Sequence, residues 1–126
     1  MKIETAKQFD MTEEQLIGLY EEMLVLSKKS PDGPTNKFKL KFINELLAKA
    51  NSLLGDSYHP LKDFDTFDEE ELPTSSDVVF ILSQYLKVMD KFRYDNTILD
   101  FGTRYWKTDD RKNNLQTKHP KYLNND

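Results

Sequence analysis

The stretch Leu72-Pro73-Thr74-Ser75-Ser76-Asp77, followed directly by residues 78–92, decides the fold of this chain. Hydroxyl and acidic residues after a proline are a typical helix start signal. From residue 78 onward, apolar side chains recur at helical spacing and cover nearly half of the helix circumference. A helix with so broad an apolar face needs cover on more than one side, so we expect it at the centre of an all-α core.

Phe80 is the exception within this helix. Its position falls on the polar face, which otherwise carries Ser83, Gln84, Lys87 and Lys91. Two interpretations remain open: either the preceding acidic connection folds over the ring, or Phe80 is an exposed contact residue.

Two further amphipathic segments precede this helix. The first begins near Asp10 or Thr12, where the spacing fits a capping box, and ends at the breaker cluster of residues 30–34. The second covers residues 36–54, with Thr35 as its N-cap. The short connection between them favours an antiparallel pair. We therefore expect a small bundle of three main helices in up-down-up order.

The remaining segments are a long connection and a C-terminal stretch. The connection, residues 55–74, is acidic, and the spacing of Thr66 and Glu69 predicts a short helical turn over residues 67–72. Residues 97–106 are rich in β-branched and aromatic side chains, but one strand alone has nothing to pair with. We expect an irregular segment there that packs on the helices. One helical domain over residues 1–106 and a polar tail over residues 107–126 follow.

The composition limits the cell compartment and the available chemistry. The chain has no cysteine, which excludes disulfides, Cys-ligated zinc, iron–sulfur clusters and thiol nucleophiles. The N-terminus lacks the apolar region of a signal peptide, and no run approaches the roughly 18 apolar residues that cross a bilayer. We expect a cytoplasmic protein without a membrane partner.

No pattern in the sequence predicts a catalytic, cofactor-binding or metal site. An EF-hand loop in the acidic connection needs an oxygen ligand, a glycine and a glutamate where the chain has Phe67, Asp68 and Thr74. A weaker cation site there stays open. The two histidines, His59 and His119, lie far apart in the sequence. No nucleophile elbow or phosphate-binding glycine loop is present, and no family resemblance is apparent.

Charge is distributed unevenly between the body of the chain and its C-terminal part. Residues 1–101 carry 12 Lys/Arg and 19 Asp/Glu, a balance of −7, whereas residues 102–126 carry six basic and three acidic residues, a balance of +3. Two segments are therefore candidate contact surfaces. The acidic candidates are Asp63, Asp65, Asp68, Glu69, Glu70 and Glu71, and the C-terminal candidates are Arg104, Tyr105, Trp106 and Lys107.

These features favour a small non-enzymatic protein that acts by protein–protein interaction, as a regulator, inhibitor, adaptor or immunity-type protein. Trp106 is either a core residue or the hot spot of such a contact. One alternative is a nucleic-acid accessory protein that uses the aromatic and basic segment, although the acidic body disfavours it. A second is a carboxylate-based or metal-assisted enzyme. A homodimer, with the tail of one copy on the acidic connection of the other, is also compatible.

Overall fold

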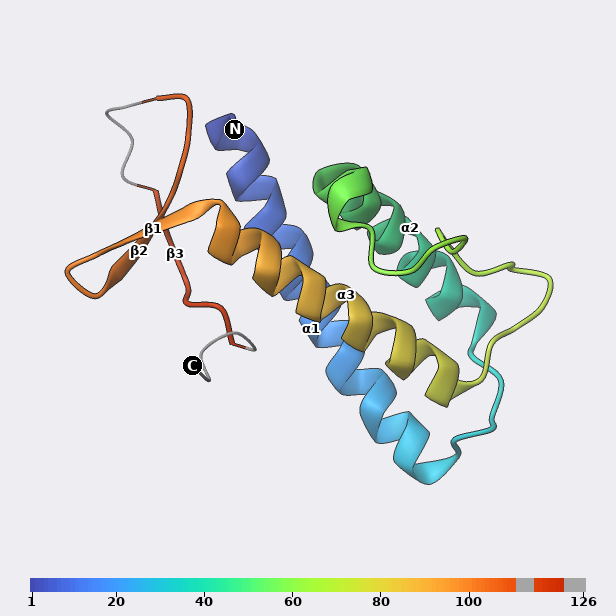
Figure 1. Cartoon of the computed structure of the whole chain (residues 1–126). Helices are drawn as coiled ribbons and strands as arrows, with labels where there is room; N and C mark the ends of the chain where they lie inside the picture. The colour runs from blue at the N-terminus through green and yellow to red at the C-terminus, as the bar shows by residue number, and fades with distance from the viewer. Residues whose placement is uncertain (111–114, 122–126) are drawn as a thin grey trace.

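The computed structural model describes residues 1–110 and 115–121 of the chain (Figure 1). The protein is mostly helical, and a small antiparallel sheet with strand order β1-β2-β3 follows the last helix. The all-α expectation is therefore correct for the body and wrong for the segment after residue 96. The elements are α1 (Ile3–Lys29), α2 (Lys37–Leu54), the 3₁₀ helix η1 (Asp56–Tyr58), α3 (Ser75–Asp95), β1 (Thr97–Asp100), β2 (Thr103–Trp106) and β3 (Gln116–Thr117).

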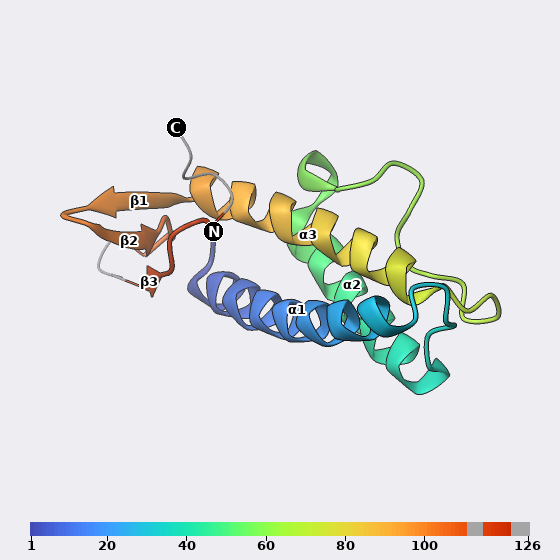
Figure 2. The ribbon, with the colours of Figure 1, turned by 90° about the horizontal axis from the view of Figure 1, so that it is seen from below.

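The three helices do not follow the up-down-up order that we predict from the sequence. The N–H of Thr35 donates to the carbonyl of Pro73 at 2.8 Å, so α2 and α3 begin at the same end of the bundle. At the other end, the ring of Tyr58 contacts that of Phe92 with centroids 5.0 Å apart. Hence α2 and α3 run parallel to each other and antiparallel to α1 (Figures 1 and 2). The connection over residues 55–74 returns the chain along α2, whose 18 residues span about 27 Å.

The helix boundaries differ from the sequence prediction at two N-termini. α1 begins at Ile3, well before Asp10, and its extra turns bury Ala6 and Phe9 in the core. The side chain of Asn36, rather than that of Thr35, caps α2 by accepting N–H bonds at 2.8 and 3.1 Å. An asparagine and a threonine are both good caps, so residue type alone does not distinguish the two neighbours.

The predicted core of α3 is confirmed. The hydroxyl of Thr74 accepts the N–H of Asp77 at 3.1 Å and caps the helix. α1 contacts both other helices and lies over the broad apolar face of α3. The side chains of that face that are buried are Val78, Ile81, Leu82, Tyr85, Leu86, Met89 and Phe92.

The segment after α3 is a β-hairpin and not an irregular stretch. Thr97 pairs with Trp106 and Asp100 with Thr103, which leaves Phe101 and Gly102 as a two-residue turn. Both turn residues have positive φ, 49° and 83°, the combination that a type I′ hairpin turn requires. The chain therefore folds back to supply the partner strand that a single strand lacked. The hairpin extends away from the helices (Figure 2).

The predicted tail contacts the rest of the protein over its described part. β3 pairs with β2 through Thr117 and Arg104, and Pro120 is buried. The N–H of Asp109 donates to the carbonyl of Met1 at 2.8 Å. Residues 111–114 and 122–126 of the predicted tail lie outside the described part.

The acidic connection contains one short helix, but at a different place from the prediction. In place of the helical turn predicted over residues 67–72, residues 68–71 form a turn closed by the N–H of Glu71, which donates to the carbonyl of Asp68 at 3.2 Å. The short helix is η1, which follows α2 after Gly55. The capping-box spacing at Thr66 is therefore not followed by a helix, because the backbone N–H and carbonyl of Phe67 form hydrogen bonds with the side chain of Asn44 in α2. Within the described residues, no helix has both the length and the apolar character needed to span a membrane.

Candidate functional site

A groove of about 550 Å³ opens between the acidic connection and the first turns of α3. We call it the acidic groove. Phe80 remains 55% exposed in it, so the connection lies beside this ring without covering it. Among the residues that line the groove, we call the apolar side chains its floor and the carboxylates its rim. The floor residues are Phe64, Phe67, Leu72, Phe80 and Ile81, and the rim residues are Asp68, Glu71 and Asp77.

Two asparagines of α2 hold the wall of the acidic groove. The side-chain amide of Asn44 donates to the carbonyl of Phe67 and accepts its N–H, both at 2.9 Å. The amide of Asn51 donates to the carbonyl of Asp65 at 3.0 Å. Between these anchors, the rings of Phe64 and Phe67 meet edge to face at 5.1 Å. Sequence reasoning missed these positioning residues, because two asparagines on a polar helix face carry no distinctive signal.

Tyr85 of α3 joins the same connection to the core. Its hydroxyl donates to Oδ1 of Asn51 at 2.5 Å and lies 3.5 Å from the carbonyl of Asp65. Burial raises the pKa of Tyr85 to about 12, because the protein interior disfavours the phenolate. The neutral phenol is therefore part of the contact between α3, α2 and the groove wall.

Alkaline pH is expected to weaken the fold through Tyr85. Its pKa is higher in the folded state than the reference value of 10.0, so its contribution to stability is complete below pH 10 and is lost as the pH rises through about 12. Urea unfolding followed by circular dichroism across this range tests the effect. Tyr85→Phe should lose less stability over this range than the wild type, whereas the exposed-site control Tyr94→Phe should behave like the wild type. An equal alkaline loss in Tyr85→Phe contradicts this assignment.

The structure brings some of the sequence-predicted acids together and leaves others outside the groove. Asp68 and Glu71 line the acidic groove, whereas Glu69 and Glu70 are exposed beyond its rim. The remaining two acids, Asp63 and Asp65, border a separate hollow beside His59. There Oδ1 of Asp65 lies 2.9 Å from Nε2 of His59.

Arg104, Tyr105 and Trp106 belong to β2, and Lys107 follows it. This strand lies beyond the C-terminal end of α3 (Figure 1), whereas Phe80 belongs to the first two turns of that helix. Trp106 is only 2% exposed; its indole contacts Phe9 and donates to Oδ2 of Asp10 at 3.0 Å. Arg104 is buried as well, under the ring of Tyr94. Tyr105 is half-buried and Lys107 is exposed. Of the two interpretations of Trp106, the structure therefore supports the first: it is a core residue.

A buried charge cluster around Arg93 is the largest feature that sequence reasoning missed. The guanidinium, 1% exposed, lies 2.8 Å from Asp10, 2.8 Å from Glu13 and 3.6 Å from Asp90. Its Nε donates to the hydroxyl of Thr117 at 3.0 Å, so the cluster joins α1, α3 and β3. The partners are separated by up to about eighty residues along the chain, and no local pattern indicates such pairing.

A second, smaller cavity of about 210 Å³ adjoins this cluster. Glu13 and Asp90 contribute to its wall together with Lys118 and Lys121. Burial alone would lower the pKa of Lys118, but hydrogen bonds and ion pairs with Glu13 and Glu14 raise it above the usual lysine value. Both wall carboxylates face Arg93, so this cavity is part of an ion-pair network.

Among the residues that the structure describes, no group of three or more His, Asp or Glu side chains is arranged to hold a metal ion. His59 and Asp65 form a pair of one histidine and one carboxylate, which is smaller than such a group. A comparison of the chain with models of known protein families, with curated proteins and with solved structures finds no match in any of the three.

Proposed function

We propose that this protein acts by binding another protein, and that the acidic groove binds a basic segment of the partner that carries an apolar anchor. One observation carries the proposal: aromatic side chains are open to solvent beside carboxylates for which the described residues supply no counter-ion. Glu71 and Asp77 form no ion pair among the described residues, and no lysine or arginine is among the residues that line the groove.

The two parts of the groove have different physical roles. Burial of exposed apolar surface is the favourable term, at about 25 cal/mol per Å² removed from water before the entropic costs of association are subtracted. Phe80 offers the largest exposed ring of the floor. The carboxylates of Asp68, Glu71 and Asp77 attract cationic residues and reject acidic ones, which supplies orientation and specificity. Such a surface suits a small regulator, inhibitor, adaptor or immunity-type protein, and the absence of cysteine suits a cytoplasmic one.

The alternatives derived from the sequence have less support in the geometry. A nucleic-acid contact through Arg104 and Trp106 depends on two side chains that are buried. A carboxylate-based site at Glu13 and Asp90 depends on two acids that are paired with Arg93. Both alternatives stay predictions.

A defined probe tests the proposal. We would measure, by fluorescence anisotropy, binding of a labelled amphipathic helical peptide of leucine, phenylalanine and lysine, beside a control peptide with glutamate in place of lysine. The basic peptide should bind in a salt-dependent manner, and Phe80→Ser and Glu71→Lys should each weaken binding by about tenfold. Phe101→Ser and Glu4→Lys make the same changes at exposed sites away from the groove and should have no effect.

Equal binding of the acidic and basic peptides contradicts the proposed function. So does a basic peptide that binds Phe80→Ser as tightly as it binds the wild type. Circular dichroism confirms that each variant is folded, which is expected because all four substituted residues are exposed.

A further inference from the structure

The protein carries a second exposed surface whose chemistry is complementary to the acidic groove. It lies on the first two turns of α2, and we call it the α2 face: Lys37, Phe38, Lys41 and Phe42. The rings of Phe38 and Phe42 are 70% and 48% exposed and meet edge to face at 5.0 Å. An aromatic pair four residues apart, with lysines beside it, is the pattern by which a helix binds an apolar groove with an acidic rim.

The charges of the α2 face are unusual for their position. The first turn of α2 contains no acidic residue and begins with Lys37, although the N-terminal end of a helix favours negative charge. Lys39 pairs with Glu22, but neither Lys37 nor Lys41 forms an ion pair within the described residues. An acidic surface placed here therefore compensates both the lysines and the positive end of the helix.

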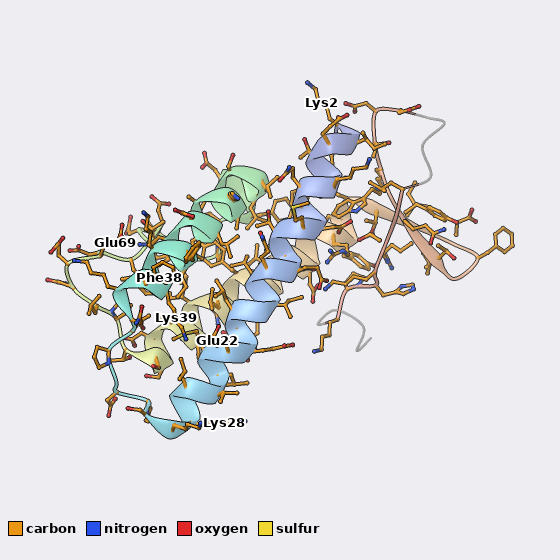
Figure 3. All side chains as sticks on the ribbon, turned by 180° about the vertical axis from the view of Figure 1, so that it is seen from behind. Lys2, Glu22, Lys28, Phe38, Lys39 and Glu69 are labelled. Carbon is orange, nitrogen blue, oxygen red and sulfur yellow. The ribbon has the colours of Figure 1, made fainter. Side chains whose placement is uncertain are left out.

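Both surfaces lie at the same end of the molecule. The starts of α2 and α3 are joined by the backbone pairing of Pro34 with Thr74. Figure 3 shows Phe38 and Glu69 at this end of the bundle, away from Lys2. In a two-fold arrangement, the α2 face of each copy can therefore meet the acidic groove of the other, which closes the assembly at two subunits.

Within its described residues, the basic C-terminal part is a poorer match for the acidic groove than the α2 face. Nζ of Lys118 lies 2.9 Å from Glu13 and 3.3 Å from Glu14 of the same chain, at the other cavity. The tip of the hairpin carries Asp100 next to Phe101, and this acid would be repelled by the groove rim. The α2 face, by contrast, combines exposed aromatic rings with two lysines that form no ion pair among the described residues, so it is open to a second copy.

We propose that the protein forms a two-fold homodimer in which the α2 face of each copy occupies the acidic groove of the other. This inference rests on the proposed function, since both use the same groove. Self-association covers Phe80 and the rim carboxylates, so the partner protein competes with the second copy for the groove. The free protein is then held in a form whose binding surface is protected.

Paired charge reversals give the decisive test. Sedimentation velocity and light scattering of the full chain, over a range of concentrations, should show a dimer that weakens at high salt. Lys41→Glu and Glu71→Lys should each raise the dimer dissociation constant by about tenfold or more, since a two-fold interface contains each changed contact twice. An equimolar mixture of the two variants should restore dimers, because the mixed pair again opposes lysine to glutamate at both contacts. Lys7→Glu and Glu4→Lys are matched controls at exposed sites of α1.

The outcomes separate this inference from the proposed function. A monomer at every concentration, or a mixture that does not restore dimers, overturns self-association. The same basic peptide is then added to Lys41→Glu, whose groove is unaltered. Tighter peptide binding to this variant than to the wild type supports competition for the groove. Restored mixed dimers without any peptide binding overturn the proposed function and leave the dimer in place.

Discussion

Arg93→Met is expected to lower the free energy of unfolding by about 3–5 kcal/mol, the cost of removing one partner from a buried ion-pair network. Arg93 is 1% exposed, and its guanidinium faces Asp10, Glu13 and Asp90. Methionine fills much of the same space but leaves Glu13, which is itself buried, without its nearest compensating charge. Urea unfolding followed by circular dichroism measures the loss.

A matched control and a double-mutant cycle make this expectation specific. Lys91→Met removes a cation two positions away in α3 that is exposed and pairs with Asp95, so it should cost less than about 1 kcal/mol. Glu13→Gln in the Arg93→Met background should cost less than in the wild type, because the charge that it removes has already lost its partner Arg93 and keeps only Lys118. A loss in Arg93→Met no larger than that in Lys91→Met contradicts a stabilising role for the cluster.

Trp106→Ala should also destabilise the protein, by about 3–5 kcal/mol, the usual cost of removing a large buried aromatic side chain. The indole is enclosed by Phe9 and Phe92, with ring centroids 5.2 and 6.4 Å away. It also donates to Asp10, which accepts from Arg93 and Thr117 as well. The substitution therefore leaves a cavity and removes a donor from the charge cluster in one step. Thermal or urea unfolding followed by circular dichroism measures it.

Trp106→Phe separates the two roles that the sequence left open for this residue. Phenylalanine keeps most of the apolar contact but loses the N–H, so it should cost about 1–3 kcal/mol. Because Trp106 lies at the far end of the bundle from the acidic groove, this folded variant should bind the basic peptide as the wild type does. Lys107→Ala, at the exposed neighbour, should change neither property. A loss of peptide binding in a stably folded Trp106→Phe protein would contradict this assignment and support a role of Trp106 in partner contact.

The candidate site was predictable in its parts but not in its assembly. The position of Phe80 on the polar face of α3 identifies it as unusual from the sequence, and the run of acids in the connection identifies a charged segment. Only the tertiary structure shows that Asp68 and Glu71 lie beside Phe80 while Asp63 and Asp65 do not. Asn44 and Asn51 decide this by binding the backbone of the connection. Phe38 and Phe42 of the α2 face carry no such signal in the sequence, because at helical spacing they fit the apolar face of the amphipathic segment 36–54 equally well.

The sequence by itself determined the three helices and the buried stripe of α3, because helical periodicity is a local property that each segment carries independently. The direction of α3 relative to α2 was decided only in the tertiary structure, since a twenty-residue connection can lead the chain either way. The same holds for the sheet, whose pairing needs the reversal at Phe101 and Gly102. It holds most strongly for Arg93, because its partners on α1 and β3 become neighbours only when the bundle has formed.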